Sequence, residues 1–312
     1  MPTVSLYRNI SRRMNEIAFS TGFYQDKYGD RRTLEIAKLL GADAVDFSLI
    51  PCDRRDKNCI YSRSDEDIEA YYADLRKYAE SLGIRIHQTH GRLGGFKDPE
   101  WNEAMIANAR IDCLATAALG AKYCVAHTVT TGYWGPDHPS EDMHRMNDEI
   151  MLPMIGFTKR YGVVLCTETF GDSRKYGCCD FFGNLNEFIK AYDRLAATDG
   201  NAEHFKVCFD SGHTNNAVRF GNPTVPDAVR MLGDRIAVLH LHDNNGLADQ
   251  HKGVGCGTIN WKATLSAFKE IGYGGVYNLE IGLEHEHFGR GFADEEISFS
   301  IKAMRNMLKT MI

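Results

Sequence analysis

The sequence predicts a single-domain (β/α)₈ barrel, for three reasons. Eight short apolar runs alternate with segments of helical periodicity, and this alternation is typical of a parallel sheet. The 312 residues are enough for one such barrel, which takes about 250 residues. No glycine-rich phosphate loop follows the first run, so a doubly wound open sheet is the weaker alternative. Residues 15–312 are assigned to the barrel, and residues 1–14 to an N-terminal extension.

The expected strands are the apolar runs, and most of them end in a polar residue. They cover residues 16–19, 44–47, 84–90, 122–127, 163–168, 205–210, 236–241 and 276–280. The apolar positions that follow each run recur with the period of a helix. The expected helices cover residues 33–40, 64–82, 100–119, 141–160, 185–196, 226–232, 261–271 and 295–308.

Local signals mark the ends of some helices and a weak point in one. Ser64 with Asp67 has the pattern of a capping box, and Asn260 is placed to cap the helix that begins at Trp261. Pro153 lies within the expected helix of residues 141–160. Since proline has no backbone N–H, we expect a kink or a break there.

Composition narrows the functional classes. The formal net charge of −6 disfavours a nucleic-acid-binding surface, which needs clustered Lys and Arg. The nine cysteines contain no Cys-x-x-Cys pair and lie mostly in apolar runs, as expected in a reducing compartment. No apolar run approaches the ~20 residues needed to span a bilayer, and residues 1–14 have no apolar core of a signal peptide. We therefore expect a cytoplasmic protein without a membrane partner.

Six of the eight expected strands end in, or run directly into, a residue that binds metals or moves protons. These residues are His90, His127, Glu168, Asp210, His240 and Glu280. Strands of a barrel run the same way, so their C-terminal ends meet on one face, where barrel enzymes do their chemistry. Imidazole and carboxylate together suit zinc, manganese, cobalt or iron. The sequence therefore predicts a shared metal site.

Three more residues of the same kinds lie just past strand ends, and we expect them at the same face: His213, Asp249 and His251. His242 lies beyond the end of its strand and is not expected to be a ligand. His87 is expected to point into the barrel interior. His285 and His287 fall in the loop after the last strand, where they are either substrate contacts or exposed residues.

Several motifs resemble those of the xylose isomerase-like barrel superfamily, from about residue 15 to residue 310. They are Leu165-Cys-Thr-Glu168, Val207-Cys-Phe-Asp210-Ser-Gly-His213, His240-Leu-His-Asp243, Gly255-Cys-Gly257-Thr-Ile-Asn-Trp261 after His251, and Gly272-Tyr-Gly-Gly275 before Glu280. The superfamily includes sugar isomerases, ketose 3-epimerases, inosose dehydratases and endonuclease IV-type enzymes.

The resemblance to ketose 3-epimerases implies a divalent metal (Mn, Mg, Co or Zn) held by Glu168, Asp210, His240 and Glu280. It also implies that the two glutamates are the bases of an isomerase or epimerase that acts through a metal-stabilised enediolate. The implied substrate is a small sugar or sugar phosphate, and the implied substrate contacts are His213, His90, His127 and His251. By the same analogy the protein forms a homo-oligomer.

One residue departs from the epimerase pattern. Gly246 stands where those enzymes carry a substrate arginine, so we expect a substrate other than a fructose-type ketose. Two alternatives remain open. One is a lyase of the inosose dehydratase kind, which uses the same metal and a base but expels water.

The other alternative is a trinuclear zinc phosphodiesterase of the endonuclease IV type. All nine ligand types of those enzymes have a counterpart here: His90, His127, Glu168, Asp210, His213, His240, Asp249, His251 and Glu280. The additional metal ligands would be His90, His127, His213, Asp249 and His251. The segment Thr-Phe-Gly-Asp-Ser after Glu168 and the negative net charge disfavour a nuclease.

Overall fold

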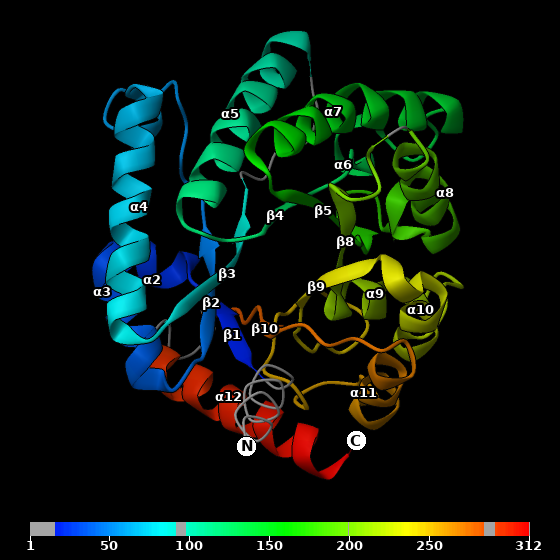
Figure 1. Ribbon diagram of the computed structural model, residues 1–312. Helices are drawn as coiled ribbons and strands as arrows, with labels where there is room; N and C mark the ends of the chain where they lie inside the picture. The colour runs from blue at the N-terminus through cyan, green and yellow to red at the C-terminus, as the bar shows by residue number, and fades with distance from the viewer. Residues whose placement is uncertain (1–15, 92–97, 199, 284–290, 312) are drawn as a thin grey trace, which may run out of the picture.

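The chain folds into a parallel β-barrel surrounded by helices, seen in a computed structural model that describes residues 16–91, 98–198, 200–283 and 291–311 (Figure 1). The eight strands pair in the order β10-β1-β2-β3-β4-β5-β8-β9. They are β1 Ile17–Ser20, β2 Ala44–Ser48, β3 Arg85–His90, β4 Tyr123–Ala126, β5 Val164–Glu168, β8 Phe205–Asp210, β9 Ile236–His240 and β10 Tyr277–Leu279. A parallel bridge between Leu241 and Leu279 joins the two ends of the sheet and closes the barrel.

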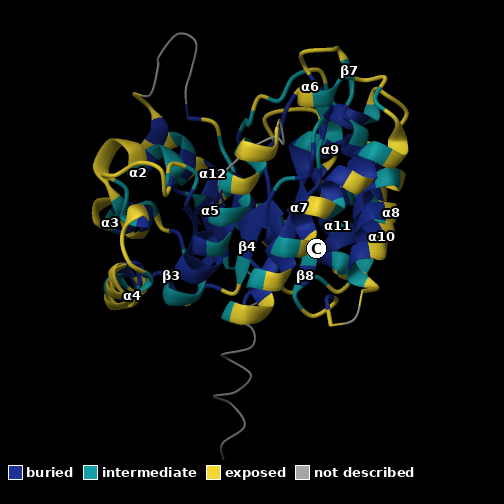
Figure 2. Ribbon diagram, turned by 90° about the horizontal axis from the view of Figure 1, so that it is seen from above, coloured by how far each residue is buried: buried dark blue, intermediate teal, exposed yellow. Residues whose placement is uncertain are grey.

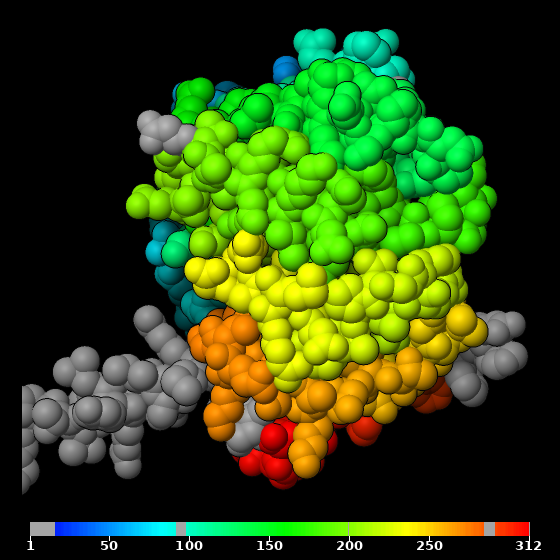
Figure 3. Space-filling model, turned by 90° about the vertical axis from the view of Figure 1, so that its right-hand side faces the viewer, coloured from blue at the N-terminus to red at the C-terminus, as the bar shows by residue number. Residues whose placement is uncertain are grey.

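The major helices follow the strands and cover the outside of the barrel. They are α3 Asp30–Leu40, α4 Asp65–Leu82, α5 Pro99–Ala118, α7 Ser140–Tyr161, α8 Leu185–Ala196, α10 Val225–Leu232, α11 Trp261–Glu270 and α12 Ala293–Thr310. Figure 3 shows the outer surface near α8, α10 and α11, where successive units lie one below another in chain order. The predicted fold class, a single-domain (β/α)₈ barrel, is confirmed.

Smaller elements that the sequence did not predict lie mostly in the loops that follow strands. They are α2 Gly22–Tyr28, α6 Thr131–Trp134, α9 Ser211–Val218, the hairpin of β6 Asp172–Ser173 and β7 Cys178–Cys179, and the 3₁₀ turns η1 Ile60–Ser62, η2 Phe181–Gly183 and η3 Gly233–Arg235. We call the end of the barrel that contains the C-terminal ends of the strands the top face. Most of these elements therefore build the top face.

The predicted caps form, and the helix that contains Pro153 is not broken, whereas a kink at Pro153 stays a prediction. The Ser64 side chain accepts a hydrogen bond from the backbone N–H of Asp67, and Asn260 accepts one from Ala263. Helix α7 continues through Pro153. A proline inside a helix costs about 3 kcal/mol. Burial of the neighbouring side chains on the same helix, Met151 and Met154 among them, offsets this cost and keeps the helix continuous.

The hydrophobic core has two layers. A small inner layer fills the barrel with side chains from neighbouring strands: Val125, Val164, Cys166, Cys208 and Val238. A larger layer lies between the strands and the helices. Figure 2 shows the buried strands at the centre and the exposed residues on the outer sides of the helices.

The predicted N-terminal extension, residues 1–14, lies outside the described residues. Among the residues that the structure describes, no helix has both the length and the apolar character needed to cross a membrane.

Candidate metal centre

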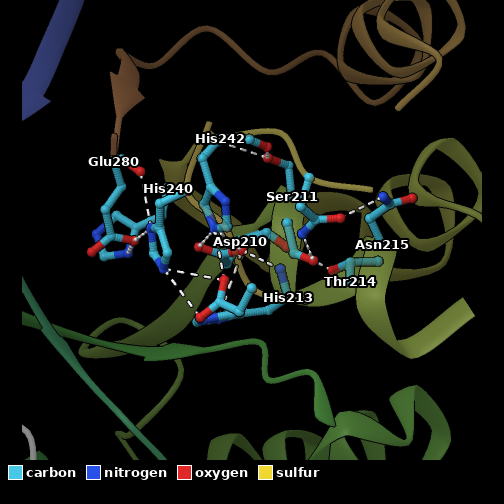
Figure 4. A network of polar contacts seen from close by, with 12 residues as sticks. Asp210, Ser211, His213, Thr214, Asn215, His240, His242 and Glu280 are labelled. Carbon is cyan, nitrogen blue, oxygen red and sulfur yellow. Dashed lines mark hydrogen bonds and ion pairs between the residues drawn. The ribbon is translucent and has the colours of Figure 1, made fainter. Parts of the chain in front are cut away.

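Four acidic and imidazole side chains meet at the top face, at the ends of four strands. Glu168, Asp210 and His240 are the last residues of β5, β8 and β9, and Glu280 follows β10. Each offers one ligand atom, and these atoms lie within 4.8 Å of one another. We call Glu168, Asp210, His240 and Glu280 the tetrad. Figure 4 shows Glu280 and His240 approaching from one side and Asp210 from the other.

Strand register brings the tetrad together. Asp210 of β8 pairs directly with His240 of β9, so their side chains leave the sheet at the same level. On the other side, the backbone N–H of Glu280 donates to the carbonyl oxygen of Leu241, which fixes Glu280 one position above the barrel closure. Parallel pairing therefore turns four residues that are distant in sequence into one cluster.

The tetrad fits a divalent cation. His240 Nδ1 lies 3.2 Å from Oε1 of Glu168 and 3.2 Å from Oε2 of Glu280. Both carboxylate oxygens of Glu168, Oε2 of Glu280 and Nδ1 of His240 are buried without a hydrogen-bond partner among the described residues. Buried carboxylates without partners are costly unless a cation or hydrogen bonds compensate them. The converging lone pairs are those that a divalent metal would use.

A second set of ligands shares Glu168. His90, His127 and Glu168, here called the His90 group, also bring their ligand atoms within 4.8 Å. His127 Nε2 lies 3.0 Å from Oε2 of Glu168, and His90 Nε2 lies 3.6 Å from the same oxygen. Glu168 therefore faces the tetrad with one oxygen and the two histidines with the other.

A third set adjoins Glu168 and Asp210 of the tetrad. We call His213, His242, Asp249 and His251 the His213 group, and their ligand atoms also lie within 4.8 Å of one another. Asp249 joins its histidines, with His251 Nε2 3.1 Å from Oδ1 and His213 Nε2 3.6 Å from Oδ2. His213 Nδ1 lies 3.4 Å from Oε1 of Glu168, which connects this group to the tetrad. All nine residues named from the sequence thus lie in three adjoining groups.

His242 is the site residue that sequence reasoning missed. Its ring is fully buried, stacks on the His251 ring at 3.8 Å and places Nε2 3.0 Å from Oδ1 of Asp210. The space for this ring exists because residue 212 is glycine: a Cβ there would lie 1.9 Å from Cε1 of His242. Gly212 is the sequence feature that points to His242, but the need for glycine there becomes clear only from the contact between the two residues.

Two further residues were singled out in the sequence. His87 lies apart from the three groups, and Gly246 has no side chain that could bind a metal. His87 is buried, and it lines a cavity of about 340 Å³ with Arg85 and Lys122, apart from all three groups. The expectation that it points into the barrel interior stays a prediction. Gly246 has a φ of 73°, a conformation that favours glycine, so an arginine there would strain the backbone. His285 and His287 lie outside the described residues.

Burial and charge act against each other in these groups. Burial alone would raise the pKa of Glu168 and Glu280, but the nearby His240 holds both pKa values below the usual range. Burial would lower the pKa of His251, but its hydrogen bond to Asp249 raises that pKa to about 9. Without a metal, these pKa shifts favour ionised Glu168 and Glu280 beside protonated His240 and His251. A metal would compete with these protons.

The whole chain can be compared with known proteins. A family model described as xylose isomerase-like TIM barrel matches residues 34–307. The chain is 40% identical over 218 residues to the uncharacterized protein MJ1311 of Methanocaldococcus jannaschii, covering 67% of this chain and 68% of that protein. It is 25% identical over 219 residues to a probable endonuclease 4 of Bacillus licheniformis, covering 60% of this chain and 67% of that protein.

Solved structures share the fold. A D-tagatose 3-epimerase-like protein has a TM-score of 0.67 at 19% identity, covering 94% of this chain and 98% of its own. The IOLI protein with a bound zinc atom has a TM-score of 0.69 at 16% identity, covering 95% and 99%. At these identities the structural similarity establishes the barrel fold alone, and the reaction has to be inferred from the residues of the site.

Proposed function

Because this chain belongs to the xylose isomerase-like TIM barrel family, we propose that it is a metal-dependent isomerase or epimerase of a sugar or sugar phosphate. The tetrad is the observation that carries the proposal. It combines a histidine and an aspartate, both suited to hold a metal, with two glutamates that can hold a metal and also move protons. A binding protein would have little use for two bases at one cation.

The residues of the tetrad divide the work. A bound divalent metal would polarise a substrate carbonyl and its neighbouring hydroxyl, which acidifies the hydrogen on the carbon between them. Glu168 and Glu280 flank the same ring nitrogen of His240, each at 3.2 Å, so they bracket one substrate position. One glutamate takes the proton, and the other returns a proton to the opposite face of that carbon or to the next carbon.

His213 is assigned to the substrate. Its Nδ1 faces both Glu168 and the carbonyl oxygen of Thr169, at 3.4 and 3.1 Å, so its ring is held beside a proposed base. Nε2 is turned toward Asp249. Contact with a substrate oxygen would use Nε2 in place of its present approach to Asp249.

Hydrogen exchange tests the proposal across many sugars at once. The metal-loaded protein is incubated in D₂O with a panel of free and phosphorylated ketoses and inososes, and products are followed by NMR and mass spectrometry. We expect one sugar to gain carbon-bound deuterium and to change configuration or carbonyl position while keeping all its oxygens. Loss of one water would favour the lyase alternative. No exchange with any sugar, in protein that binds metal, would contradict the proposal.

A second candidate function is metal-dependent phosphodiester hydrolysis. The observation in its favour is that the His90 group and the His213 group adjoin the tetrad, and that they contain histidines suited to zinc. Metal content per chain, together with cleavage of bis-p-nitrophenyl phosphate and of a duplex with an abasic site, tests it. Three zinc ions with cleavage would support hydrolysis, whereas one metal without cleavage excludes it.

A further inference from the structure

A buried carboxylate lies inside the barrel beneath the tetrad. Asp46 is the third residue of β2 and has no exposed surface. Its Oδ2 accepts hydrogen bonds from the Ser20 hydroxyl at 2.9 Å and from Nδ2 of Asn278 at 3.2 Å. The same oxygen lies 3.1 Å from Nε2 of His240, within ion-pair distance, although the two atoms do not meet the geometry of a hydrogen bond. In the part of the chain that the structure describes, no Lys or Arg forms an ion pair with Asp46, and the imidazole of His240 faces its Oδ2.

The two nitrogens of the His240 ring face different surroundings. Nδ1 is directed toward the two glutamates of the tetrad, and Nε2 is directed away from them, toward Asp46. A histidine that binds a metal through one nitrogen carries its hydrogen on the other, and a carboxylate that accepts this hydrogen fixes the ring and strengthens the ligand.

We propose that Asp46 is a positioning residue of the metal centre, which accepts the Nε2 hydrogen of His240 and so directs Nδ1 toward the metal. This inference rests on the proposed metal-dependent function, and it adds a residue outside the tetrad. Asp46 would act through His240 and would touch neither the substrate nor the reacting atoms.

The surroundings of Asp46 are built for this role. Ser20, Asp46 and Asn278 come from β1, β2 and β10, three neighbouring strands, and Asn278 also donates to the Ser20 hydroxyl at 3.2 Å. Both donors hold the oxygen that faces His240. The two hydrogen bonds restrain this oxygen against moving with the His240 ring. Asp46 therefore sets the orientation of the ring.

One rival arrangement uses the same residues. Asp46, His90 and His240 each offer an atom within 4.8 Å of the others, so Asp46 could itself be a ligand. In that case removing its charge should cost a whole metal ion. In the proposed arrangement every metal remains, but it binds less tightly.

Cobalt binding separates these cases. Metal-free protein is titrated with Co²⁺ against a competing chelator, and the visible spectrum, the dissociation constant and the number of ions are recorded. We expect Asp46→Asn to weaken binding by about 10- to 100-fold with the number of ions unchanged. Ser20→Ala removes one donor to Oδ2 and should weaken binding in the same direction by less, which keeps the test open if Asp46→Asn does not fold.

The matched control is Asp180→Asn. Asp180 is equally buried and accepts backbone hydrogen bonds from Thr131 and Phe182, but it contacts none of the proposed ligands. This variant should keep the wild-type affinity for Co²⁺. Unchanged affinity in both Asp46→Asn and Ser20→Ala, or the loss of one whole ion in Asp46→Asn, would overturn the role of Asp46. Failure of the wild-type protein to bind Co²⁺ would instead overturn the metal-dependent function itself.

Discussion

Replacement of Glu280 by glutamine should separate catalysis from folding. The substitution keeps the size of the side chain but removes a charge 3.2 Å from Nδ1 of His240 and, by the proposal, a base. A positioned general base contributes about 10²- to 10⁴-fold, so the turnover should fall by at least this factor, which corresponds to about 3–5 kcal/mol in the barrier. Loss of a metal ligand would add to this effect.

The cost in stability should be smaller. Attraction to His240 outweighs repulsion by Glu168 and keeps the pKa of Glu280 low, so the ionised carboxylate stabilises the folded metal-free protein. Leaving a buried polar group without its partner costs about 1–3 kcal/mol. A protein of this size should then lose about 2–12 °C of melting temperature, because about 1 kcal/mol corresponds to roughly 2–4 °C.

The assay measures deuterium uptake by the identified sugar, and the melting temperature is recorded on the same samples. Glu187→Gln is the matched control, since Glu187 forms a 2.6 Å pair with His144 outside the barrel. We expect Glu187→Gln to keep wild-type turnover with a similar change in melting temperature. If Glu280→Gln, loaded with metal, kept wild-type exchange, the assignment of Glu280 as a base would be wrong.

Three other changes have defined outcomes. Gly212→Ala should displace His242 and lower the free energy of unfolding by about 1–3 kcal/mol. Gly156→Ala in α7 is the control and should leave this free energy unchanged, because a Cβ at residue 156 meets no atom within 4 Å. Melting curves of the two variants compare these effects. Burial, aided by Arg85, lowers the pKa of His87 from 6.5 to about 3, so the folded state favours the neutral ring. That stabilisation is complete above pH 6.5 and is lost as the pH falls toward 3. Between pH 7 and pH 5 the free energy of unfolding of the wild type should therefore fall by about 2 kcal/mol more than that of His87→Gln. Urea unfolding at the two pH values measures this difference, and equal losses in the two proteins would refute the reasoning. Metal binding at pH 7 should release protons, because the pKa of His240 is well above its usual value and a metal would displace the proton. Titration with metal in weak buffer measures this release. No release would mean that the histidines are not ligands.

Much of the barrel and of its site could be predicted because the information is local. The run Phe205–Asp210 is apolar except for Lys206 until its last residue, so the sequence located both the strand and the acidic residue at its end. The same logic located Glu168 and His240. Since parallel strands bring their ends together, the strand pattern alone was enough to expect a shared site.

What the sequence could not reveal depends on contacts between distant strands. Helix α9 contains Gly212 and two asparagines, which are poor helix formers; it forms because Asp210 accepts a hydrogen bond from the backbone N–H of His213 at its start. The position of His242 requires Gly212 in the first turn of α9. Asp46 looked like a single acidic residue in an apolar strand, and its role depends on His240 across the barrel.

Anomalous diffraction from crystals grown with Mn²⁺ would test the metal-dependent function most directly. We predict an anomalous peak at coordination distance from Glu168, Asp210, His240 and Glu280, with Nδ1 of His240 directed toward it. Additional peaks in the His90 group and the His213 group would favour the hydrolytic alternative. Absence of any peak at the tetrad, with Mn²⁺ in excess and the side chains ordered, would contradict the metal centre and the isomerase chemistry that depends on it.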